Sequence, residues 1–214
     1  RLLRSMSSDA SGSAEKFLKK YDVNIWLSTK VISFDGRTVI LSNGKQIESG
    51  NLIWAAGVTG AIFPGLNPEI VTSQNRIKVG AFNGVEGYEN IYAIGDIAAM
   101  ISDRMPQGHP QLAPVAIQQA GVLGRNLKAK LLGRPMRPFK YNDIGVMATV
   151  GRNNAVVDLP FIKFQGIIGW FVWVFVHLMS LVGFRNRVVA FVNWAWNYCS
   201  YDRGLRLIIR PVRR

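Results

Sequence analysis

The spacing of apolar positions at the start of the chain predicts one helix followed by short strands. Apolar residues recur every three or four positions across residues 9–21, with charged residues on the opposite face, as in an amphipathic surface helix. Segments 23–27, 30–35 and 37–44 are instead rich in β-branched and aromatic residues, which predicts strands. An Asp-Gly pair after the second segment and an Asn-Gly pair at the end of the third are hairpin signals. This order of a helix, a strand and a meander suggests the second half of a nucleotide-binding α/β domain.

Two short apolar runs in the middle of the chain predict buried strands followed by small residues. Residues 52–54 lead into the small residues 55–57, which would let the backbone lie close against a flat ligand, although a crowded crossover without a ligand is the simpler interpretation. Residues 91–94 are followed by Gly95, Asp96 and a helical pattern of small residues. Open α/β sheets bind ligands at the carboxyl ends of their strands, and a carboxylate there accepts hydrogen bonds from a polyol. At this point a ligand-binding turn and an ordinary Gly-Asp turn are equally good interpretations.

Residues 114–133 have the pattern of a helix that Pro114 opens, because proline suits the first helical turn. Basic residues gather toward the carboxyl end, so the positive amino end is free to face an electron-rich group such as a reduced flavin ring or a phosphate. A surface helix with no ligand is the alternative. Residues 139–159 alternate small and β-branched residues, which predicts a hairpin or short sheet. Residues 152–154 could hydrogen-bond a cofactor or form the turn, and we favour the turn.

The last third of the chain is first apolar and then basic. Residues 166–183 are 18 positions without a charge, which fits a transmembrane helix, a buried core helix or a helix lying in the membrane interface. His177 lies inside this run, and we interpret it as a packing residue bonded to a backbone carbonyl. Residues 185–214 interleave aromatic residues with one acid, Asp202, and seven arginines: Arg185, Arg187, Arg203, Arg206, Arg210, Arg213 and Arg214. This mixture favours an anionic lipid surface over single-stranded nucleic acid, because the adjacent apolar run would be a solubility hazard on a nucleic-acid protein.

Composition narrows the class of protein further. The chain has 214 residues, 49% of them hydrophobic, and a formal net charge of +13, so it can bury a core and needs an anionic partner. Its single cysteine excludes an intrachain disulfide and a CxxC redox pair, and its two distant histidines suggest no metal site. The first residue is Arg1 rather than Met, and the opening segment lacks the apolar core of a signal peptide. We therefore expect the chain to be truncated at its amino end.

Three motifs in a fixed order carry a resemblance to a known family. They are WAAGVTG at 54–60, NIYAIGD at 90–96 and LAPVAIQQ at 112–119, and the aromatic, arginine-rich stretch 173–187 follows them. The ordered set resembles type II NADH dehydrogenases, the single-subunit NADH:quinone oxidoreductases. The resemblance extends over essentially the whole chain.

The resemblance implies an α/β fold that forms part of a two-dinucleotide-binding-domain flavoprotein, with a carboxyl-terminal helical membrane-anchoring region. Residues 1–54 would be the back half of the NADH-binding domain, and residues 55–133 the carboxyl-terminal half of the FAD-binding domain. Residues 134–160 would be a short β segment that completes the FAD domain, and residues 161–214 would be the membrane anchor.

The same resemblance implies an FAD site within this chain. Asp96 would hydrogen-bond the ribityl chain of FAD, and Gly95 would shape the turn that presents it. Ala56 and Gly57 in the crossover would lie near the cofactor. Ala113, at the amino end of the following helix, would bring the positive end of that helix toward the flavin.

That helix departs from the family's pattern at one position. The family's motif, Ala-Gln-x-Ala-x-Gln, lies under the flavin ring and near the quinone, and here Pro114 replaces its first glutamine. Proline keeps the helix start but has no side-chain amide, so the quinone or NADH contact that the family makes there is in question. Gln118 remains as the quinone-site candidate, with Gln119 beside it.

The function implied by the resemblance is FAD-dependent oxidation of NADH by a membrane quinone. A hydride passes from NADH to FAD, and two electrons then reach the quinone, without proton pumping because the chain lacks a series of charged transmembrane helices. We expect the protein at the cytoplasmic face of the inner (plasma) membrane, on an anionic lipid surface, with homodimerisation through the tail as a further expectation. The alternatives are a non-enzymatic membrane-associated module and a soluble ferredoxin-type flavin reductase, which would leave the membrane-like tail unexplained.

The chain contains no G-x-G-x-x-G fingerprint, which FAD and NADH each need for their pyrophosphates. We therefore predict that these 214 residues alone neither hold FAD tightly nor oxidise NADH. The measurement is flavin absorbance after expression of this segment and extraction with detergent. A stoichiometric yellow protein that reduces a quinone analogue would contradict the prediction.

Overall fold

The computed structural model describes residues 1–61, 63–103 and 105–200, and it divides into two compact units. The terminal unit combines Arg1–Thr29 with the chain from Gly145 onward, and the central unit is Lys30–Ile144. Each unit has its own hydrophobic core. The two units are therefore described separately.

The terminal unit opens with α1 (Ser8–Lys20), which confirms the predicted amphipathic helix. Ser7 caps it, because its hydroxyl oxygen accepts the N–H of Ala10. Ser7 also donates its own N–H and its hydroxyl to the two carboxylate oxygens of Asp158, at 2.6 and 3.0 Å. The cap therefore fixes the start of α1 to the sheet of this unit.

That sheet has three antiparallel strands in the order β6 (Val146–Thr149), β7 (Ala155–Asp158) and β8 (Lys163–Gln165). It confirms the short sheet predicted from the small and β-branched residues. The turn from β6 to β7 closes through a hydrogen bond from the Val150 N–H to the Asn154 carbonyl, and Asn153 in that turn takes a positive φ of 63°. The predicted turn at 152–154 is therefore confirmed.

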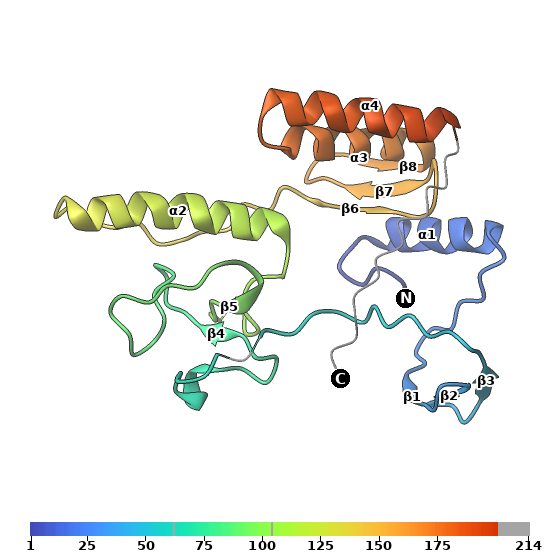
Figure 1. Cartoon of the computed structure of the whole chain (residues 1–214), viewed down its shortest axis with the longest axis horizontal. Coiled ribbons are helices and arrows are strands. Elements are labelled where there is room, and N and C mark those ends of the chain that lie inside the picture. The colour runs from blue at the N-terminus through green and yellow to red at the C-terminus, as the bar shows by residue number, and fades with distance from the viewer. Residues whose placement is uncertain (62, 104, 201–214) are drawn as a thin grey trace, which may run out of the picture. The chain divides into compact units, whose positions relative to one another are not determined.

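The central strand β7 is the core of the terminal unit. Its first three residues are essentially inaccessible to solvent, because helices cover both faces of the sheet (Figure 1). On one face Val156 packs with Met6 and Ala10 at the start of α1, and α3 (Gly166–Ser180) lies over the other face. A strand buried on both faces is apolar along its length, as residues 155–157 are.

Outside α3 lies α4 (Phe184–Ser200), which has no buried residue. In α3 only Gly169 and Leu178 are buried, so the alternative of a fully buried core helix is wrong for the segment 166–183. Among the described residues, no helix combines the length and the apolar character needed to cross a membrane. His177 bonds through Nδ1 to the Trp173 carbonyl, at 2.8 Å, which confirms its interpretation as a packing residue on its own helix.

One predicted strand in the terminal unit is wrong. Residues 23–27 form no strand, and Val23, Trp26 and Leu27 are exposed. Asp22 and Ser28, on either side, both take positive φ angles of 54°, so the chain turns at each end of this segment. A strand needs a hydrogen-bonded neighbour, and none of the described strands pairs with this segment.

The central unit begins with the antiparallel meander β1 (Val31–Phe34), β2 (Thr38–Leu41) and β3 (Gln46–Glu48), which confirms both predicted hairpins. The Asp35 carboxylate closes the first turn by accepting backbone N–H groups at 2.8 and 2.6 Å, and these two bonds lower the pKa of Asp35. The Asn43 side chain closes the second turn in the same way. Asx side chains bonded to the backbone two or three residues ahead are typical of such turns.

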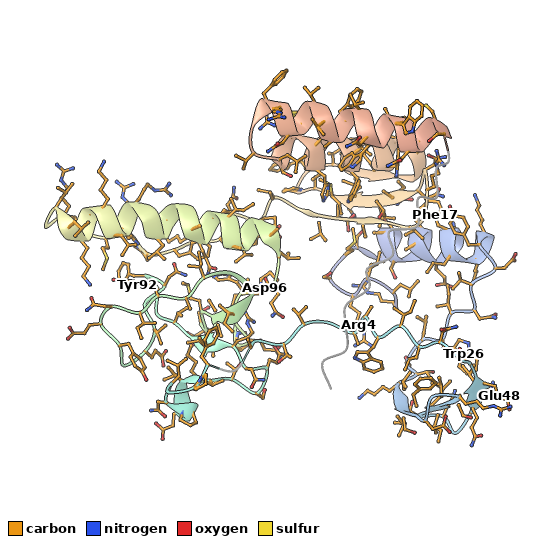
Figure 2. All side chains as sticks on the ribbon, viewed as in Figure 1. Arg4, Phe17, Trp26, Glu48, Tyr92 and Asp96 are labelled. Carbon is orange, nitrogen blue, oxygen red and sulfur yellow. The ribbon has the colours of Figure 1, made fainter. Side chains whose placement is uncertain are left out.

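The core of the central unit lies under α2 (Ala113–Leu131), close to the predicted helix 114–133. Beneath it β4 (Ile77–Lys78) pairs in parallel with β5 (Ala98–Ala99), and two short 3-10 helices, η1 (Pro68–Ile70) and η2 (Gly95–Ile97), flank these strands. Figure 2 shows Asp96 beneath the amino end of α2 and Tyr92 toward its carboxyl end. The buried core residues are Ile70, Ile77, Val79, Val85, Ala93, Ala98, Met100, Val115 and Phe139.

Three expectations for this unit are corrected. Residues 52–54 form no strand, and Ile53 and Trp54 are 90% and 66% exposed. Residues 91–94 form only an isolated bridge from Tyr92 to Gly84, and the residues after Asp96 form η2 and β5 instead of a helix. A strand buried on both faces needs paired neighbours and covering layers, and the described part of the central unit supplies these only in part.

Candidate functional site

The turn at Gly95 and Asp96 is fixed on both sides by side chains. The Gly95 N–H donates to Oε1 of Gln119, at 2.7 Å, and Gln119 on α2 is only 1% exposed. The Asp96 carbonyl accepts two further bonds, from Nε of Arg76 at 3.1 Å and from Nε2 of Gln111 at 3.2 Å. The main chain before and after the Asp96 side chain is therefore held in place.

Glycine is required at the first position of this turn. Gly95 takes a φ of +71°, a conformation that residues with a Cβ rarely adopt. A Cβ at this position would also come within 3.2 Å of the Ala116 side chain on α2. The turn therefore packs tightly against α2.

The Asp96 side chain itself makes none of these bonds. It is exposed, and within the described residues its carboxylate accepts no hydrogen bond. It lines a hollow of about 280 Å³ together with Ile97, Gln111, Phe63 and residues 58–61. A carboxylate with unused acceptor oxygens thus faces a concave surface of the size of part of a ligand.

The hollow joins two motifs that lie far apart in the sequence. Residues 58–61 follow directly on the small residues 55–57, so the end of WAAGVTG meets the Asp96 turn. Gly60 makes this approach possible, since a Cβ there would lie 2.7 Å from Cδ1 of Ile97, next to Asp96, and would overlap the Asn75 carbonyl oxygen. Ala56 and Gly57 themselves are exposed and lie just before the lining residues.

Arg76 is the buried charge behind this site. It is 5% exposed, and its guanidinium donates to four backbone carbonyls: Asp96, Ala98, Gln107 and His109. Among the described residues no carboxylate lies within ion-pair distance of it. Burial lowers the pKa of Arg76, and the charge of Asp96 acts in the opposite direction. Arginine nevertheless stays protonated, because its ordinary pKa lies far above neutrality.

His109 is packed beside this charge. Its ring lies edge-on to Phe139 and Tyr141, with ring centroids 5.2 and 5.9 Å away. Burial lowers the pKa of His109, and the Arg76 charge lowers it further, so the imidazole is neutral at neutral pH. Of these two neighbouring side chains, only Arg76 therefore carries a positive charge beside the Asp96 turn.

The amino end of α2 has no side-chain cap. Leu112 stands at the cap position without a side-chain cap, Pro114 occupies the first turn, and Ala113 is exposed. The N–H groups of Val115 and Ala116 both donate to the Leu112 carbonyl.

The two glutamines proposed from the sequence for the quinone both bond to protein backbone. Gln118 pairs with Asn142 through both ends of its amide, donating to the carbonyl at 2.9 Å and accepting the N–H at 3.0 Å. Gln119 holds the Gly95 N–H and is buried. In this arrangement the amide of Gln118 ties the segment after α2 to the helix, and the amide of Gln119 ties the Asp96 turn to it.

Sequence reasoning missed Arg76 and Gln111. In the sequence Arg76 stands between Asn75 and Ile77 without a motif around it, and Gln111 is a single polar residue directly after Pro110. A lone arginine among mixed polar and apolar residues is a weak signal, because most such arginines are solvated. Their role depends on carbonyls brought together from two distant segments.

Comparison with known proteins defines the class. The sequence profile of the pyridine nucleotide-disulphide oxidoreductases matches residues 1–120, more than half of the chain, and that of the NDH2 C-terminal domain matches residues 144–199. The first part of the chain thus belongs to the pyridine nucleotide-disulphide oxidoreductase superfamily, and the later part matches the NDH2 C-terminal domain. Within it, the chain belongs to the type II NADH:quinone oxidoreductase (NDH2) family and covers the carboxyl-terminal part.

Individual relatives agree with this assignment. The chain is 33% identical over 198 residues to the type II NADH:quinone oxidoreductase Ndh of Mycobacterium tuberculosis, covering 87% of this chain and 42% of the relative. It is 30% identical over 173 residues to an internal alternative NAD(P)H-ubiquinone oxidoreductase A1 of Solanum tuberosum, covering 73% and 35%. The chain thus spans less than half the length of these curated relatives.

The fold also has a close counterpart among solved structures. The structure of NDH2 from Plasmodium falciparum in complex with NADH superposes with a TM-score of 0.78 and 17% sequence identity, covering 98% of this chain and 57% of that one. The sulfide:quinone oxidoreductase of Aquifex aeolicus gives a TM-score of 0.57 at 13% identity, covering 91% and 48%. The mixed α/β NDH2-like flavoprotein fold expected from the motifs is therefore confirmed.

Proposed function

We propose that the full-length protein is a membrane-associated, FAD-dependent NADH:quinone oxidoreductase, and that this chain supplies its carboxyl-terminal portion. The observation that carries the proposal is the Asp96 carboxylate, anchored through its main chain and aimed at a hollow, in a chain of the NDH2 family. The relatives' names describe NADH and quinone as substrates of those proteins. Their extension to this protein is part of the proposal.

The residues around the hollow fit a flavin cofactor. A ribityl chain offers hydroxyl donors, and the Asp96 carboxylate offers acceptor oxygens that no described residue uses. Gly95 lets the turn approach both the helix and a ligand. The exposed backbone at Ala56 and Gly57 leads directly into the hollow, which supports their place near the cofactor.

The amino end of α2 supports the same site. With no side-chain cap at Leu112, the positive end of the helix dipole remains available near Ala113. Pro114 is compatible with the first turn of the helix, but it has neither a backbone N–H nor a side-chain amide, so it can contribute only apolar contacts there. The bound flavin would supply the hydride acceptance and two-electron transfer. The chain itself orients the cofactor through Asp96 and places a helix end and a buried cation behind it.

We assign Gln118 and Gln119 a supporting role for the quinone. Both amides hold backbone groups, so each acts by positioning α2 rather than by binding the acceptor directly. NADH is proposed as the electron donor on the strength of the family, and no single residue of this chain is assigned to it.

The terminal unit supports a membrane-facing role. Large apolar side chains are exposed along both α3 and α4, and a groove of about 650 Å³ between these helices is lined by aromatic residues. Arg152 lines the groove as well, with its guanidinium 4.3 Å from the centre of the Tyr198 ring. Apolar surface of this extent on a soluble enzyme would be an aggregation hazard, whereas it suits lipid and a lipid-soluble quinone.

Cations accompany this apolar surface. Arg185 and Arg187 lie at the start of α4, and the other five of the seven arginines fall outside the described residues. Arginine beside aromatic side chains favours an anionic lipid surface at the cytoplasmic face of the inner membrane. The exposed apolar helices also weigh against the alternative of a soluble ferredoxin-type reductase. Homodimerisation through this unit stays a prediction.

Replacing Asp96 tests the cofactor site. In the full-length protein we expect Asp96→Ala to lower the flavin content and to raise the dissociation constant for FAD at least about tenfold, because hydrogen bonds to a charged group contribute roughly 1.5–3 kcal/mol. Flavin absorbance and titration of the apoprotein measure both. Asp103→Asn, an exposed acid of the same unit, is the control and should leave FAD binding unchanged. Equal affinity of Asp96→Ala and the parent protein would contradict the proposal, as would an equal loss in the control.

Replacing exposed residues of α3 tests the membrane face. Ile168 and Phe175 lie two helical turns apart on one face and are both more than half exposed. We expect Ile168→Ser with Phe175→Ser to lower sedimentation of the full-length protein with phosphatidylglycerol vesicles about tenfold, since two apolar side chains no longer enter the lipid. NADH oxidation with ferricyanide should persist. Ile32→Ser, at an equally exposed position on β1, is the control. Unchanged vesicle binding by the double variant would refute a membrane role for α3.

A further inference from the structure

Arg76 draws together two segments that the sequence separates. Its Nη2 donates to the Ala98 carbonyl on β5 at 2.6 Å and to the His109 carbonyl at 2.9 Å, and its Nη1 donates to the Gln107 carbonyl at 2.9 Å. Together with the bond from Nε to the Asp96 carbonyl, these contacts hold both ends of the loop that runs from η2 to α2. The Arg76 side chain thus holds the two ends of this loop close together.

The backbone of Arg76 is itself anchored. Its N–H donates to the hydroxyl of Thr72 at 3.1 Å, and its carbonyl accepts the Thr72 N–H at 2.8 Å. The next residue begins β4, which pairs in parallel with β5. The guanidinium therefore reaches its four carbonyls from a fixed base.

The contacts suit a guanidinium and not an ammonium. Arg76 uses N–H groups on all three nitrogens of a planar fork to reach carbonyls at separate positions. A lysine ammonium carries its donors on one nitrogen, so it cannot span the same set of acceptors. Within the described residues the hydrogen bonds of the guanidinium go only to carbonyls, and burying a cation without an ion pair costs free energy unless such bonds satisfy its donors.

We propose that Arg76 is the positioning residue of the flavin site, acting through Asp96. It holds the Asp96 carbonyl directly, and by holding the His109 carbonyl it places Gln111, whose amide bonds the same Asp96 carbonyl. Both Asp96 and Gln111 line the hollow. This inference rests on the proposed flavin site.

The test is a double-mutant cycle in the full-length protein, with the dissociation constant for FAD as readout. Arg76→Lys keeps the positive charge but loses the planar set of N–H donors on three nitrogens. We expect it to raise the dissociation constant for FAD at least about tenfold. In an Asp96→Ala background, Arg76→Lys should change FAD affinity less than about twofold, because the group it positions is gone. Arg125→Lys, at an exposed position on α2, is the matched control and should have no effect in either background.

Other outcomes separate the two hypotheses. If Asp96→Ala lowers FAD affinity and Arg76→Lys leaves it unchanged, or if the two effects simply multiply, Arg76 has only a structural role and the inference is overturned. If Asp96→Ala itself has no effect, the proposed flavin site fails first. Should Arg76→Lys fail to fold, Gln111→Ala carries the same cycle from the loop that Arg76 places. An effect of Gln111→Ala that persists in full without the Asp96 carboxylate would equally overturn the inference.

Discussion

Four backbone carbonyls converge on the buried guanidinium of Arg76, and the rest of the central unit is arranged to make that convergence possible. The parallel pairing of β4 with β5 brings Arg76 beside the Asp96 turn, and α2 closes over it from the other side through Gln119. Because buried carbonyls must be bonded, the loop after β5 folds back to the guanidinium instead of leaving its polar groups unpaired. The Asp96 carboxylate is exposed and accepts no hydrogen bond from the described residues.

The two units have different parts in the proposed function. The central unit presents the Asp96 carboxylate beside a mostly apolar hollow, on a turn held by Arg76, Gln111 and Gln119, which suits the orientation of a cofactor. The terminal unit buries its strand β7 between α1 and α3 and leaves the apolar sides of α3 and α4 exposed, which suits contact with lipid and a lipid-soluble acceptor. A respiratory oxidoreductase that works at a membrane needs both kinds of surface.

Local sequence patterns predicted the elements that local interactions determine. The helix at 8–20, the two Asx-closed hairpins, the helix opened by Pro114 and the small sheet around β7 depend on capping, turn chemistry and periodicity, all of which are visible in a short window. The strands expected at 23–27 and 52–54 were wrong because a short apolar run looks the same with or without a pairing partner. The helix expected after Asp96 was wrong for a similar reason, since β5 depends on the distant β4.

In the candidate site, too, the residues within a local motif were visible in the sequence, and those that act through distant contacts were not. The residue pattern singled out Gly95 and Asp96 as either a ligand-binding or an ordinary turn, and the family resemblance then assigned the turn to FAD, an assignment that stays a prediction. The hollow beside residues 58–61 brings that motif together with WAAGVTG. The anchors, Arg76 and Gln111, act on backbone carbonyls, which have no sequence signature of their own. The domain boundaries at 54, 133 and 160 stay predictions.

The central claim is that the Asp96 turn belongs to an FAD site in an enzyme that passes electrons from NADH to a quinone. Its most direct measurement is the flavin content of the full-length protein purified from membranes, together with NADH oxidation in the presence and absence of a quinone analogue. We expect one FAD per chain and oxidation of NADH that depends on the quinone. A folded, membrane-bound protein that carries no flavin and reduces no quinone would contradict it.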